Sequence, residues 1–139
     1  MSVQMVLLPV FVLVFLTFGL MFWMGRVRTT ALNSGTKIRD IALNQPAWPE
    51  EAMKASNCFN NQFEMPVLFY VVVALALPLR QMDLVMVCLA WVFVVTRYAH
   101  AYVFLTSNHV PRRFGAYFAG VLVLLAMWLY FALRILLVI

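Results

Sequence analysis

The first 25 residues, Met1–Gly25, contain no charged side chain. A helix needs about 20 mostly apolar residues to cross the hydrocarbon core of a bilayer, so this stretch predicts a transmembrane helix. No charged segment precedes the apolar run, which is longer than the core of a signal peptide, and no Ala-x-Ala cleavage pattern follows it. We therefore expect the span to stay attached to the protein.

The rest of the chain supports a membrane protein. Of its 139 residues, 65% are hydrophobic and only 11% are charged, whereas soluble domains carry about 25% charged residues. This composition excludes an ordinary soluble protein, a disordered chain and a nucleic-acid-binding domain. The two cysteines, Cys58 and Cys88, show no CxxC spacing, so neither a disulfide framework nor a metal site is expected.

Hydropathy divides the chain into four predicted spans, at about residues 1–25, 49–79, 83–105 and 113–139. Pro49 followed by Glu50 and Glu51 is typical of a helix start, since proline fits the first turn and acidic groups favour the positive end of the helix dipole. The second and third spans are joined by a short turn, which predicts an antiparallel hairpin. We expect one all-α domain, residues 1–139, with four transmembrane helices in a left-handed bundle.

Cations beside the spans predict the orientation. Two loops on one side of the membrane hold Arg26, Arg28, Lys37, Arg39, Lys54, Arg112 and Arg113. The other side holds Arg80, with Arg134 near the end of the last span. The positive-inside rule then predicts that both long loops are cytoplasmic and that both termini are outside.

Several polar residues interrupt the apolar spans, near the predicted cytoplasmic ends. They are Asn57, Asn60, Asn61 and Glu64 on one face of the second span, Arg97 and His100 on the third, and Arg113 and Tyr117 on the fourth. Polar groups in a membrane face the bundle interior or a wet cavity and mark candidate functional sites. A structural interpretation stays open, in which Glu64 pairs with Arg97 and the asparagines join helices by hydrogen bonds.

Three sequence motifs are similar to those of a known family. The run Asn61-Gln62-Phe63-Glu64-Met65-Pro66 resembles the second-helix Asn-x-x-Glu motif of the MAPEG family, the membrane-associated proteins in eicosanoid and glutathione metabolism. Arg97-Tyr98-Ala99-His100, and Pro111-Arg112-Arg113 with Tyr117, resemble that family's third-helix and fourth-helix motifs. The resemblance covers nearly the whole chain and is greatest for the bacterial branch of the family.

The resemblance implies a homotrimer that binds glutathione between neighbouring protomers near the cytoplasmic face. It assigns glutathione binding to Asn61, Glu64, Arg97, His100 and Tyr117, and it implies that Arg113 stabilises the glutathione thiolate. The implied function is a glutathione-dependent transferase or peroxidase in a bacterial inner membrane. Its second substrate is a lipophilic electrophile or lipid hydroperoxide from the bilayer.

Two departures from the family pattern keep an alternative open. Phe104 stands where several members have a tyrosine, and the arginine expected before Asn61 in eukaryotic enzymes is absent. The alternative is a non-catalytic lipid-binding protein or an accessory subunit of a larger membrane complex. A transporter is disfavoured because the chain has no inverted repeat.

Overall fold

The computed structural model describes residues 2–35, 42, 48–106 and 110–137, and this part of the chain contains helices and no strands. The elements are α1 (Val3–Asn33), α3 (Glu50–Asn60), the 3₁₀ turn η2 (Asn61–Phe63), α4 (Met65–Ala76), α5 (Leu84–Leu105) and α6 (Val110–Leu137). Four helical segments are long and apolar enough to cross a membrane: Val3–Asn33, Glu50–Ala76, Leu84–Leu105 and Pro111–Leu137. The prediction of an all-helical chain with four helices able to cross a membrane is confirmed for the described residues.

Two helices extend beyond the predicted spans. The first continues past Gly25 to Asn33, so that Arg26 and Arg28 lie on a helix rather than in a loop. At 31 residues and a rise of about 1.5 Å each, α1 is longer than the hydrocarbon core is thick. The fourth helix begins at Val110, because a proline is compatible with a first helical turn. Arg113 therefore lies in the first turn of α6.

The second span is not the single helix that we predicted over residues 49–79. α3 ends at Asn60, one 3₁₀ turn follows, and Glu64 has φ −100° and ψ −99°, outside the helical region. The physical reason is Pro66, which lacks an N–H group and whose ring conflicts with the carbonyl four residues earlier in a continuous helix. The chain restarts as α4 with this proline in its first turn.

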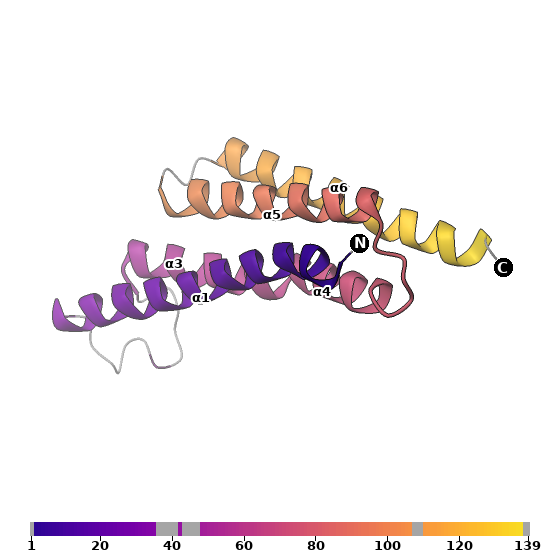
Figure 1. Cartoon of the computed structure of the whole chain (residues 1–139). Helices are drawn as coiled ribbons and strands as arrows, with labels where there is room; N and C mark the ends of the chain where they lie inside the picture. Colours follow the sequence, from indigo (N-terminus) through magenta and orange to yellow (C-terminus); the bar gives the residue numbers. More distant parts are fainter. Residues whose placement is uncertain (1, 36–41, 43–47, 107–109, 138–139) are drawn as a thin grey trace.

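The helices form two layers, with α1, α3 and α4 in one and α5 and α6 in the other (Figure 1). The core between them is apolar and includes the stacked rings of Phe69 and Phe93, whose centroids are 4.9 Å apart. α6 approaches α5 closely at Gly120, where an added Cβ would lie 3.1 Å from Thr96 Oγ1. Outward-facing aromatic side chains on α1, as expected for a lipid-facing surface, are Phe11, Phe15, Phe18 and Phe22.

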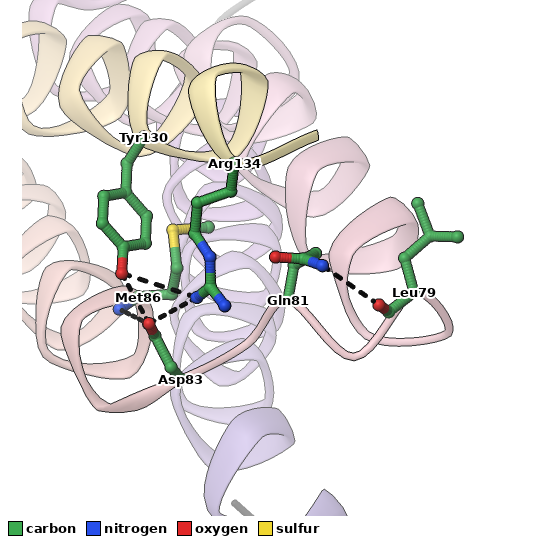
Figure 2. A network of polar contacts seen from close by, with 6 residues as sticks. All are labelled: Leu79, Gln81, Asp83, Met86, Tyr130 and Arg134. Carbon is green, nitrogen blue, oxygen red and sulfur yellow. Dashed lines mark hydrogen bonds and ion pairs between the residues drawn. The ribbon is translucent and has the colours of Figure 1, made fainter. Parts of the chain in front are cut away.

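The bundle has two chemically different ends. At the turn end, where α4 passes into α5, Asp83 caps α5 by accepting a hydrogen bond from the Met86 amide at 3.1 Å. Tyr130 and Arg134 of α6 both donate to Asp83 Oδ2 (Figure 2). Burial alone would raise the pKa of this carboxyl, but the hydrogen bonds from Tyr130 and Met86 and the charge of Arg134 together lower the pKa. This network joins the start of α5 to the last turns of α6.

Candidate functional site

A polar cavity of about 510 Å³ lies at the loop end of the bundle, where α3 and α5 end and α6 begins. Side chains from all three helices line it: Asn57, Asn60, Asn61, Glu64, His100, Phe104, Arg113, Phe114 and Tyr117. Five of the six residues predicted for the site are among them. The sixth, Arg97, does not line the cavity.

One wall is the polar face of α3 and the turn that follows it. Asn57, Asn60 and Glu64 are exposed and Asn61 is half-buried. Amides offer both donors and acceptors, whereas an ionised carboxylate only accepts. Among the residues that the structure describes, Glu64 and Arg97 form no ion pair with each other, so the structural alternative in which they pair is not found.

The opposite wall carries the positive charge of the cavity. The Arg113 guanidinium lies over the Phe104 ring, with its Cζ atom 4.9 Å from the ring centroid. The His100 ring is 5.8 Å from the Phe104 ring and 6.1 Å from the Tyr117 ring, measured between centroids. A guanidinium is attracted to the face of an aromatic ring. Phe104 therefore supplies a surface on which Arg113 packs.

Sequence reasoning did not assign Phe104 to the site. The available signal was its spacing, because Arg97, His100 and Phe104 recur at intervals of three and four residues and share one face of a helix. The close approach of Arg113 from another helix had no signal in the sequence. Phe114, a second aromatic residue of the cavity, was also missed.

Arg97 lies behind the wall of the cavity. Only 1% of its surface is exposed, and its Nη2 atom donates a hydrogen bond to the backbone carbonyl of Asn61 at 3.4 Å. His100, one turn further along α5, is 3% exposed but does line the cavity. The two residues share a helix face, as predicted, but they occupy different layers of the site.

The cations of α1 lie elsewhere. Arg28 donates to Ser56 Oγ at 2.8 Å, and its guanidinium lies 5.1 Å from the centroid of the Trp48 ring. Arg26 lines a separate cavity of about 490 Å³ together with Trp23 and Glu51. Neither arginine of α1 is among the residues that line the polar cavity.

The cavity combines a carboxylate, three amides, an imidazole, a guanidinium and a phenol at one end of a membrane-spanning bundle. Such a site suits a ligand that carries both an amino group and acidic groups, since each finds an opposite charge. Aromatic side chains beside Arg113 add an apolar surface.

Comparison with known proteins identifies one family. The family model described as the MAPEG family matches residues 6–133, a range that includes every residue lining the cavity. No curated protein and no solved structure shows a significant similarity to the chain.

Proposed function

Because the chain belongs to the MAPEG family, we propose that it is a glutathione-dependent membrane transferase or peroxidase. Its second substrate would be a lipophilic electrophile or a lipid hydroperoxide. The observation that carries this proposal is the gathering of Asn61, Glu64, His100, Arg113 and Tyr117 around one cavity by three separate helices.

Each wall of the cavity has a proposed role. The Glu64 carboxylate holds the amino end of glutathione, and the Asn61 amide pairs with its peptide groups. His100 and Tyr117 line the rest of the cavity and contact the remainder of the ligand. Arg113 stabilises the thiolate, because a nearby positive charge favours the ionised form of a thiol and the thiolate is the nucleophile.

The chemistry that follows needs no cofactor beyond glutathione. With an electrophile, the thiolate sulfur forms a bond to carbon and the leaving group departs with the electron pair of its bond. With a hydroperoxide, the thiolate takes the terminal oxygen, the lipid alcohol leaves after protonation, and a second glutathione converts the sulfenic acid to a disulfide with release of water.

We also propose the assembly and orientation that the sequence predicts. The exposed amides of α3 and the Glu64 carboxylate after η2 would be costly against lipid, which favours a neighbouring protomer over that face. The resemblance to the family implies that the assembly is a homotrimer. The excess of cations at the loop end favours a cytoplasmic location for it. We propose further that the protein resides in a bacterial inner membrane and that its helices pack as a left-handed bundle.

A non-catalytic role is the second candidate, and a specific observation favours it. The ring that meets Arg113 and His100 is a phenylalanine, so this position offers a ligand no hydroxyl. A lipid-binding or accessory subunit of a larger membrane complex could keep the cavity without turnover. Co-purification of a stable partner with empty glutathione sites would favour this role.

A glutathione titration of the detergent-purified protein tests the proposal. The signal is the ultraviolet absorbance of the thiolate, and we expect it to saturate. Glu64→Gln should weaken glutathione binding about tenfold or more, because the ligand's ammonium group loses its charged partner. Glu51→Gln is the matched control, since Glu51 is exposed and does not line this cavity. Absence of saturation from an intact oligomer would refute the proposal.

A further inference from the structure

The helix break between α3 and α4 leaves backbone carbonyl groups without their regular helical donors, and it lies beside the proposed glutathione site. The proline that interrupts the helix removes a backbone donor, so carbonyl groups before the break lose regular helical partners. Two of the residues that the break carries, Asn61 and Glu64, are also cavity residues. The conformation of the break therefore decides where their side chains lie.

One carbonyl at the break has a side-chain donor from another helix. The Asn61 carbonyl accepts a hydrogen bond from the Glu64 amide at 3.3 Å and a second from Arg97 Nη2 at 3.4 Å. A charged donor strengthens a hydrogen bond, and a carbonyl has two lone pairs that can accept both. Arg97 thus ties the 3₁₀ turn to α5.

The position of Arg97 separates it from the ligand. It is 1% exposed and absent from the cavity lining, whereas His100, on the next turn of the same helix face, does line the cavity. A buried side chain that bonds the backbone behind the cavity can affect a ligand only by changing the position of the residues that line the cavity.

We propose that Arg97 is a positioning residue that holds the break between α3 and α4, so that Asn61 and Glu64 face the cavity. The link to ligand binding rests on the proposed function, whereas the effect on the break does not. The sequence resemblance implied direct contact between Arg97 and glutathione, and the geometry assigns a different role to the same residue.

The first experiment measures hydrogen exchange of residues 59–66 in the protein without ligand. Arg97→Met removes the donor and keeps an unbranched side chain, so exchange in this segment should rise about tenfold, as expected for loss of one charge-assisted hydrogen bond. Arg80→Met is the control, because it removes an exposed arginine at the turn end and should leave the segment unchanged. Unchanged exchange in Arg97→Met would overturn the proposal, whether or not the protein binds glutathione.

The second experiment measures glutathione affinity and the pH dependence of thiolate formation. Arg97→Met should weaken affinity about tenfold and move the pH midpoint much less than Arg113→Ala does, since Arg113 lines the cavity and Arg97 lies behind its wall. A midpoint that moves as far as in Arg113→Ala would mean that Arg97 acts directly on the ligand, and it would overturn the proposal. Absence of glutathione binding by the unmodified protein would refute the proposed function, while the exchange measurement would still decide the role of Arg97.

A conservative variant keeps the test valid if Arg97→Met does not fold. Arg97 uses one N–H group toward one carbonyl, so an ammonium group can replace it in Arg97→Lys. We expect exchange and affinity in this variant to stay within about threefold of the unmodified protein, a smaller change than the loss of a hydrogen bond causes. Lost affinity with unchanged exchange would indicate direct recognition by the guanidinium group and would overturn the proposal.

Discussion

Two adjacent arginines at the start of α6 allow a sharp test of the thiolate mechanism. Arg113 lines the cavity and packs on Phe104 with Cζ 4.9 Å from the ring centroid. Arg112 is exposed and does not line the cavity. Replacing each by alanine removes the same charge from neighbouring positions, so that the local geometry is what differs between the two variants.

The magnitude follows from the ionisation of the ligand thiol. A cysteine thiol has an ordinary pKa of about 8.5, so about 3% of it is thiolate at pH 7. A positive charge within roughly 4–6 Å lowers the pKa of an acidic group by about 1–3. The thiolate fraction at pH 7 then rises to about 24% at the lower bound and about 97% at the upper bound. Arg113→Ala should therefore reduce the thiolate, and the rate that depends on it, by about 8- to 30-fold.

The assay is the pH dependence of kcat/KM with a chromogenic aryl halide as the electrophile, paired with thiolate absorbance. In Arg113→Ala the midpoint should rise by about 1–3 pH units, and in Arg112→Ala it should stay in place. Equal shifts in the two variants would show that the overall positive charge of this end of the bundle, rather than a contact, ionises the thiol. No shift in either would refute the role of Arg113.

Two further predictions concern the turn end. Folding lowers the pKa of Asp83. The ionised carboxylate therefore contributes stability that is fully present above the ordinary pKa of about 3.9 and is lost as the pH falls through the lowered pKa. Asp83→Asn keeps an N-cap residue and should lose less thermal stability in acid than the unmodified protein. Arg80 has φ 58°, a conformation that costs a non-glycine residue about 1–2 kcal/mol. Arg80→Gly should therefore stabilise the protein by about 1 kcal/mol, measured by thermal unfolding. Arg80→Ala is the control and should bring no such gain.

Some features of the fold followed directly from residue types along the chain. The charge-free run at the N-terminus identifies a span because the bilayer core is apolar and sets a minimum length. The helix break was present in the sequence as Pro66 but was not predicted, since membrane helices often tolerate proline when neighbouring groups satisfy the freed backbone. In this chain Arg97 of α5 is such a neighbour.

The candidate site was predictable as a group of residues but not as an arrangement. Asn61, Glu64, His100, Arg113 and Tyr117 were predicted for the site because polar groups are rare in membrane spans and because their spacing resembles a family motif. All five line one cavity.

Two features were decided by the tertiary structure alone. It gave Phe104 a contact with the Arg113 guanidinium and set Arg97 behind the wall of the cavity. The sequence determines which side chains share a face of their own helix, because helical periodicity is local. Which face meets which helix depends on where each helix begins, breaks and packs, and those contacts join residues that are far apart in the chain.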